Sequence, residues 1–288
     1  MNLEEFRKRG KERYLDRIKN FETLCRYAGQ LSKESTDKQT DERGFYGSPL
    51  FAKAVMTTWT LNKLLPFSKN FSKCFDQELW DLSSICILTR GLIDNYYLLF
   101  YLCIEDIQAE ELEFRLMLWQ LHSSCERLKM LDKIGSRNPE LNNVKKKTEK
   151  IRQVLLNNRF FNSLKSREQK KFLKGKEGVA LTRSVISKRA SINPEYAFSV
   201  YKYLSQYVHS YSFAIEDIIK FNTNDLDALL VINTVVEEAI VYLSYAIKGF
   251  RTLEISNIGS IPNDVSNIID IWIDIAENFG NYQKLQNV

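Results

Sequence analysis

The stretch LWDLSSICILTRGLIDNYYLLFYLCI, Leu79 to Ile104, decides the fold of this chain. Its apolar residues fall on every side of a helical wheel, which predicts a helix buried on most of its faces. At roughly 26 residues the helix is long enough to span a bilayer. Arg90, Asp94 and Asn95 lie in its middle, however, and charges there are costly in lipid. The stretch is therefore interpreted as the central helix of a soluble bundle, and no membrane span is expected.

Two polar pairs lie on this helix and on the next one. Arg90 and Asp94 are four residues apart and share one face. A buried pair of this kind is more often structural than catalytic. The next predicted helix runs from Ile107 to about Leu131. It places Arg115 and His122 on the same side, because seven residues are almost two helical turns.

Apolar residues recur at steps of three and four from Leu3 to Phe279, without strand alternation or an Asn-Gly hairpin. We therefore predict an all-α, multi-helix bundle built around the buried central helix. Helix starts are predicted where a residue can cap the N-terminus or a proline can occupy the first turn. These starts are Ser48-Pro49, Asp76, Asn138-Pro139, Asn193-Pro194 and Pro262.

Charge is distributed unevenly along the chain. Arg127 to Ala190 holds 19 Lys and Arg against 5 Asp and Glu, a local net charge of +14, so the rest of this +5 chain carries −9. Segregation on this scale predicts an anionic partner such as RNA, or attraction to a protein partner. A solvated lysine surface is an equally good explanation. The expected phosphate-binding residues are Lys145, Lys146, Lys147, Lys150, Lys170 and Lys171.

The basic stretch from Arg127 to Ala190 also suggests how the chain is divided into domains. Residues 1–134 are expected to form the N-terminal helices and the central bundle. Residues 135–192 are expected to be a basic helical insertion, since periodicity weakens between Ser163 and Ser191. Residues 193–288 are expected to complete the bundle, within one continuous domain of a size that can bury a large core.

Cysteine usage and absent motifs limit the function classes. The five cysteines are scattered and include no CxxC pair, which suits a reducing cytoplasm, and the N-terminus has no apolar signal segment. The chain contains no GxxxxGK[ST], GxGxxG or GxSxG motif, so no nucleotide cofactor is expected. His122, Cys125 and Glu126 have metal-ligand spacing, but two histidines in all argue against a zinc site. No metal is therefore expected.

The segment FRLMLWQLHSSCE carries Arg115 and His122 in an Arg-x6-His spacing. This resembles the Arg-x4–6-His motif of HEPN domains, small helical bundles found in many bacterial RNases and toxins. The resemblance implies a histidine that transfers protons, an arginine that steadies phosphate charge, and two motifs that meet across a homodimer. The chain departs from the motif at Leu116, where a polar residue is usual.

A second resemblance rests on YKYLSQYVHSYS, which contains His209, and on TRGLIDNYYLLFYL, which contains Arg90 and Asp94. Together these stretches are similar to HEPN-like and abortive-infection bundles, over Trp80 to Phe250. Lys202 occupies the place of the motif arginine, so an inactive version of the motif fits equally well. A structural explanation is also open, because a histidine at a helix C-terminus stabilises the helix as a cation.

Two function hypotheses follow. The first is a cytoplasmic, HEPN-like, metal-independent ribonuclease or toxin in bacterial phage defence. Its candidate catalytic residues are His209, His122, Arg115, Arg90 and Asp94, and its basic surface would hold the RNA backbone. The second is a non-catalytic helical partner or scaffold subunit, which docks another protein through its segregated basic and acidic faces.

Overall fold

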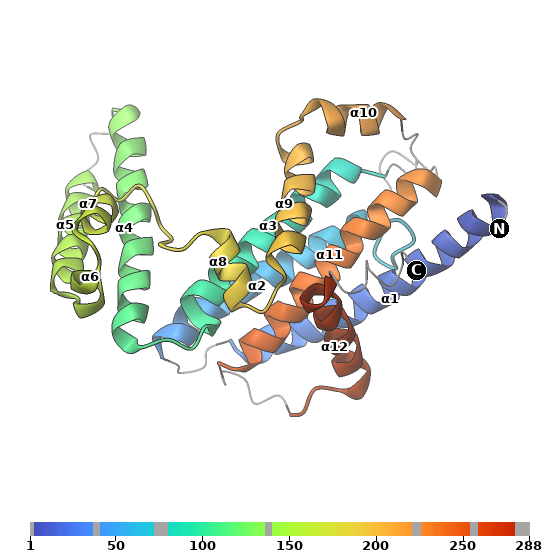
Figure 1. Cartoon of the computed structure of the whole chain (residues 1–288), viewed down its shortest axis with the longest axis horizontal. Coiled ribbons are helices and arrows are strands. Elements are labelled where there is room, and N and C mark those ends of the chain that lie inside the picture. The colour runs from blue at the N-terminus through green and yellow to red at the C-terminus, as the bar shows by residue number, and fades with distance from the viewer. Residues whose placement is uncertain are drawn as a thin grey trace. The chain divides into compact units, whose positions relative to one another are not determined.

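The computed structural model describes residues 3–36, 41–71, 80–135, 140–220, 226–253 and 259–279. Over these ranges the chain forms twelve α-helices and one π-helical turn, and no strand (Figure 1). The helices pack against one another through apolar faces, so the predicted all-α bundle is confirmed.

The chain forms two compact units. The larger comprises Met1–Ile104 and Ile186–Val288, and the smaller comprises Glu105–Val185. The expected insertion at 135–192 overlaps the smaller unit, but this unit also takes in α4 (Ala109–Lys133). The reason is packing, since α4 lies against α5 (Glu140–Asn157) and α6 (Arg159–Ser163).

The core of the larger unit forms around α3 (Leu82–Leu99), which continues as the π-helical turn η1 (Phe100–Ile104). α3 packs against α2 (Glu42–Leu64), α9 (Pro194–Val208) and α11 (Leu226–Arg251), and α1 (Leu3–Glu34) packs against α11 (Figure 1). Leu92, Ile93 and Tyr96 are among its buried side chains. The predicted central helix is therefore present.

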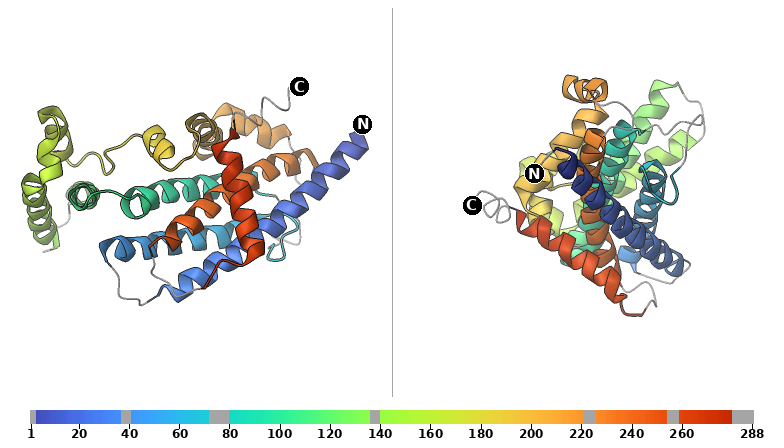
Figure 2. Two further views of the ribbon diagram at one scale, coloured as in Figure 1. Left: turned by 60° about the horizontal axis from the view of Figure 1, so that its bottom comes forward. Right: turned by 90° about the vertical axis from the view of Figure 1, so that its right-hand side faces the viewer.

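A second long helix, α11, is as central as α3. Among the described residues, Asp227–Arg251 is the one helical segment whose length and composition would allow it to cross a membrane. Its most apolar window is 67% buried within the protein. Because α1, α2, α3 and α12 (Asn263–Glu277) surround it, α11 is explained as a core helix (Figure 2).

The capping signals had mixed outcomes. Asn193 accepts hydrogen bonds from the backbone N–H groups of Glu195 and Tyr196 at 2.9 and 3.2 Å, as predicted. α12 starts directly after Pro262, also as predicted. The predicted start at Ser48-Pro49 is wrong: α2 begins at Glu42, where Asp41 accepts from the Gly44 N–H at 2.9 Å, and Pro49 lies inside the helix.

Two further predicted starts lie outside the described residues, namely Asp76 and Asn138-Pro139. The cap of α3 is Asp81, which accepts from the Ser84 N–H at 2.9 Å. α4 ends at Lys133, and the following Gly135 has φ of +62°, a conformation that favours glycine.

The smaller unit has its own apolar core. α5, α6 and α7 (Ser166–Leu173) gather along α4 (Figure 1). The aromatic rings of Phe160, Phe161 and Phe172 lie within 6.2 Å of the Phe114 ring, centroid to centroid. The buried members of this core are Phe114, Leu118, Leu121, Cys125, Ile151, Leu155, Phe161 and Phe172.

Candidate functional site

The best candidate site lies where α3 meets α9 in the larger unit. Arg90 of α3 donates from Nε to the Ser205 hydroxyl of α9 at 3.1 Å. It also donates from Nη2 to the Tyr201 hydroxyl, and its guanidinium carbon lies 4.3 Å from the centroid of the Tyr201 ring. One turn of α9 thus holds the guanidinium in place, because Tyr201 and Ser205 are four residues apart and share a face.

Asp94 completes the arginine's surroundings. Its carboxylate lies 3.3 Å from Arg90 Nη1, one turn along α3. The side chain of Asp94 is 40% exposed and that of Arg90 is 19% exposed. The pair is therefore only partly buried, which differs from the buried pair that the sequence predicted, because the Asp94 side chain faces solvent. Such an ion pair contributes little to stability and can exchange its partner for another anion.

His209 lies one turn beyond Ser205. It is the residue that ends α9, and its backbone N–H bonds to the Ser205 carbonyl at 3.2 Å. Its side chain is exposed, and its ring centroid lies 5.5 Å from that of Tyr211. The sequence resemblance grouped Arg90, Asp94 and His209, and in the structure Ser205 links them: it accepts from Arg90 with its side chain and from His209 with its backbone carbonyl.

A tyrosine pair, of which Tyr207 is buried and Tyr203 partly buried, supports this end of α9. The Tyr207 hydroxyl donates to the Asp217 carboxylate of α10 (Ser212–Lys220) at 2.7 Å, and the Tyr203 hydroxyl lies 3.2 Å from that of Tyr207. Burial raises the pKa of Tyr203 to about 12, and burial likewise raises the pKa of Tyr207 far above its ordinary value. Both hydroxyls therefore remain neutral, and the hydrogen bond from Tyr207 to Asp217 holds α10 against α9.

Arg115, in the smaller unit, has a different environment from the one predicted for a catalytic residue. Its side chain is 1% exposed. Its Nη1 lies 2.5 Å from the Glu105 carboxylate, and its Nε donates to Glu111 at 3.0 Å. Two carboxylates thus neutralise one buried guanidinium, which describes a structural ion-pair network.

His122 is also engaged within the smaller unit. Its Nδ1 lies 3.1 Å from the Gly175 carbonyl oxygen, so Nδ1 carries the proton in this bond. Gly178 packs so closely on the ring that an added Cβ would lie 3.0 Å from His122 Cδ2. The contact fixes the loop after α7 against α4. Although Arg115 and His122 share a helix, each bonds to its own partners.

The predicted phosphate-binding lysines all lie on the surface of the smaller unit. Lys145, Lys146, Lys147 and Lys150 are exposed on α5, opposite its buried residues. Among the described residues, none of these four forms an ion pair. Lys170 and Lys171 are exposed on α7, and Lys171 pairs with Glu177 at 2.8 Å. Four exposed lysines between residues 145 and 150 of α5 form a positive surface.

An exposed apolar helix was missed from the sequence. α10 follows His209 directly, and its apolar residues Phe213, Ile215, Ile218 and Ile219 are 45, 41, 46 and 76% exposed. The signal was present as apolar residues on both sides of Glu216 and Asp217 in SFAIEDIIK, but nine residues are too few for periodicity to identify a helix.

In the part of the chain that the structure describes, no group of three His, Cys, Asp or Glu side chains is placed to hold a metal ion. Comparisons with curated proteins and with solved structures found no match. A match was found to a family of unknown function, DUF5677, and it covers residues 74–227, including α3 and α9. Because the match covers more than half of the 288 residues, the chain belongs to the DUF5677 family.

Proposed function

We propose that this protein is a HEPN-like, metal-independent ribonuclease. Its active site would lie where α3 meets α9, in a cluster made of Arg90, Asp94, Tyr201, Ser205 and His209. The hydrogen bond from Arg90 Nε to Ser205 Oγ at 3.1 Å carries this proposal. It ties the Arg-x-x-x-Asp helix to the turn that precedes an exposed histidine. The proposal includes a bacterial setting, as a toxin or in phage defence, which the HEPN resemblance implies, and a cytoplasmic location, which the scattered cysteines favour.

In the proposed reaction, His209 accepts the proton of an RNA 2′-hydroxyl. The 2′ oxygen attacks the adjacent phosphorus, and the bond from phosphorus to the 5′ oxygen breaks. The departing oxygen takes a proton from water or from His209 of a second copy. The products are a 2′,3′-cyclic phosphate and a 5′-hydroxyl end.

Arg90 stabilises the charge that develops on the phosphate oxygens. Its Nη1 exchanges the 3.3 Å contact with the exposed Asp94 carboxylate for a phosphate oxygen. Tyr201 and Ser205 meanwhile hold Nη2 and Nε in place, so the guanidinium needs no large rearrangement. The exposed lysines of α5 and α7 bind the RNA backbone without reading its sequence.

A cleavage assay on fluorescent single-stranded RNA, with EDTA present, tests this proposal. His209→Ala and Arg90→Lys are each expected to slow cleavage by on the order of a hundredfold or more. His122→Ala is the matched control, because it changes the other histidine of the chain and should leave the rate within about threefold of the parent's, since it removes no group from the reaction. Equal loss in all three variants, or an inactive parent protein, would remove the ribonuclease proposal.

The exposed apolar face of α10 favours a second candidate function, a non-catalytic helical partner protein. Phe213, Ile218 and Ile219 present exposed apolar side chains on the helix that follows His209, and such surfaces mark protein interaction sites. Sedimentation of the parent and of Phe213→Ser/Ile219→Ser distinguishes the alternatives. A dimer that dissociates in the variant with loss of cleavage agrees with a HEPN-like dimer, whereas a stable monomer without cleavage favours the partner protein.

A further inference from the structure

A pocket of about 340 Å³ opens between α9, α11 and α12 in the larger unit. Aromatic rings form much of its wall, namely Tyr196, Tyr203, Trp272 and Phe279. Its volume lies within the range of small-molecule sites, and its mainly apolar wall is typical of them. None of the residues that line it is basic.

One carboxyl group gives this pocket its polar character. Glu238 of α11 is partly buried on the pocket wall, and its Oε2 accepts a hydrogen bond from the Tyr196 hydroxyl. Within the described residues, its Oε1 has no hydrogen-bond partner. Burial raises the pKa of Glu238 to about 8, the Tyr196 hydrogen bond lowers it, and neighbouring Glu237 raises it.

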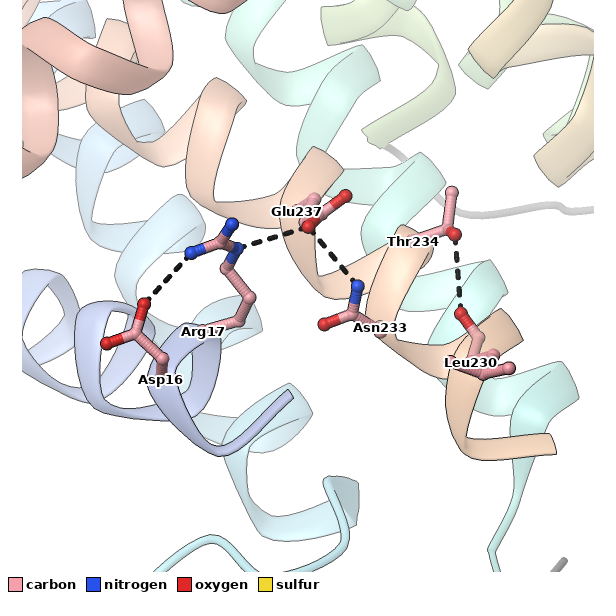
Figure 3. A network of polar contacts seen from close by, with 6 residues as sticks. All are labelled: Asp16, Arg17, Leu230, Asn233, Thr234 and Glu237. Atoms are coloured by element: carbon pink, nitrogen blue, oxygen red, sulfur yellow. Dashed lines mark hydrogen bonds and ion pairs between the residues drawn. The ribbon is translucent and has the colours of Figure 1, made fainter. Parts of the chain in front are cut away.

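The charge of the neighbouring carboxylate, Glu237, is already balanced by an arginine. Arg17 of α1 donates to Glu237 at 3.1 Å, and Asn233 donates to the same oxygen at 3.2 Å (Figure 3). Arg17 also donates to Asp16 at 2.9 Å and lies 4.9 Å from the centroid of the Trp272 ring. Glu237 is thus compensated from outside the pocket, whereas Glu238 has a neutral hydroxyl for its partner.

We propose that this pocket binds a small hydrophobic amine as its cation, with Glu238 Oε1 accepting from the ammonium group and the aromatic rings enclosing the hydrocarbon part. A carboxylate in an apolar wall makes charge-assisted hydrogen bonds, and ring faces attract cations. An anionic ligand would meet Glu238 without a basic side chain to offset it. This binding is independent of the proposed RNA chemistry, which uses the other side of α9.

Cation binding favours the ionised carboxylate, so it should release a proton from Glu238. Among the described residues, the titratable groups that interact with this carboxyl are Tyr196 of α9 and Glu237 and Tyr242 of α11, and Arg17 pairs with Glu237. Burial raises the pKa of both tyrosines far above its ordinary value, so they stay neutral. Affinity should therefore rise with pH through the range in which Glu238 ionises.

Isothermal titration calorimetry of the full chain with three probes of one shape tests this inference: 2-phenylethylamine, 2-phenylethanol and phenylacetate. The amine is expected to bind on the order of tenfold more tightly than the alcohol, because its hydrogen bond involves two charges. Phenylacetate is expected to bind most weakly. Proton release should appear as a dependence of the binding enthalpy on the buffer.

Three variants make the test specific. Glu238→Gln should remove the preference for the amine while keeping the pocket's shape. Val200→Phe should lower the affinity for all three probes, because the larger side chain fills part of the pocket. Glu195→Gln is the matched control, since it is an exposed carboxylate on α9 that does not line the pocket. Equal binding of the three probes, preference for phenylacetate, no binding, or an amine preference that survives in Glu238→Gln would each overturn the inference.

Discussion

Arg90 of α3 reaches across to α9 and donates to Ser205 at 3.1 Å, although 115 residues separate the two in the chain. Their contact joins the two halves of the larger unit that flank the smaller one. The same guanidinium packs on Tyr201 and faces Asp94. Arg90 is therefore both a structural link between helices and a cation bonded to Ser205, in the turn that precedes His209.

The two members of the Arg90–Asp94 pair should contribute very differently to stability. Asp94→Ala is expected to lower the free energy of unfolding by less than about 1 kcal/mol, since its carboxylate is two-fifths exposed. Arg90→Ala is expected to cost about 1.5–3 kcal/mol, because it removes hydrogen bonds from a charged donor to Ser205 and Tyr201. Chemical denaturation of both variants checks the contrast. Equal costs would contradict the link between α3 and α9.

Arg115 should be essential to the smaller unit. Arg115→Ala leaves Glu105 and Glu111 facing a buried vacancy, so a cost of about 3–5 kcal/mol is expected. Arg167→Ala is the matched control, since Arg167 is an exposed residue of α7 in the same unit. Hydrogen exchange of the α4 backbone measures the effect within this unit. Unchanged protection in Arg115→Ala would show that the two carboxylates find other partners.

Sequence patterns identified the elements well where one local signal acted alone. Asn193-Pro194 starts α9 as predicted, and the apolar run of α3 forms the buried helix. The start of α2 was misplaced because two cap signals competed. Asp41 caps the helix instead of Ser48, and the turns before Ser48 pack against a distant part of the chain: an added Cβ on Gly47 would lie 2.7 Å from Leu253, more than 200 residues later. A prediction from neighbouring residues in the sequence cannot include a contact between residues so far apart in the chain.

The candidate site was predictable in part for the same reason. The spacing of Arg90 and Asp94 on one helix is local, and so is the position of His209 at a helix end. The bond from Arg90 to Ser205 depends on how α3 crosses α9, which the sequence does not state. The spacing of Arg115 and His122 is equally regular, but burial gave these two side chains separate structural partners.

The lysines of α5 should control any binding of RNA. Lys145, Lys146 and Lys147 are exposed and form no ion pair with a described residue, so a bound phosphate would displace only counterions. Reversing all three to Glu should weaken binding and flatten its dependence on salt. His209→Ala should bind as the parent does, because proton transfer affects the chemical step. Fluorescence anisotropy with labelled RNA at several salt concentrations measures both. An unchanged salt slope would show that these lysines are a solvated surface.

Glu238 should make stability depend on pH. Its folded pKa of about 8 lies above its ordinary value of 4.5, so the folded protein holds a proton that the unfolded chain releases between these values. The free energy of unfolding should therefore be unaffected by this group below about pH 4.5. It should then fall as pH rises toward 8, in total by an amount on the order of 1–3 kcal/mol.

Glu238→Gln cannot ionise, so it should remove this fall, and above pH 8 the variant should be more stable than the parent. Glu195→Gln should retain the parent's dependence on pH, because Glu195 is an exposed residue at the start of α9. Urea denaturation at pH values from 5 to 9 measures the stability of the three proteins. The same dependence on pH in the parent and in Glu238→Gln would contradict a buried carboxyl at this position.

A hydrophobic amine that binds the ionised carboxylate should restore the parent's stability at high pH. The same amine should leave Glu238→Gln unchanged, which links the stability measurement to the pocket.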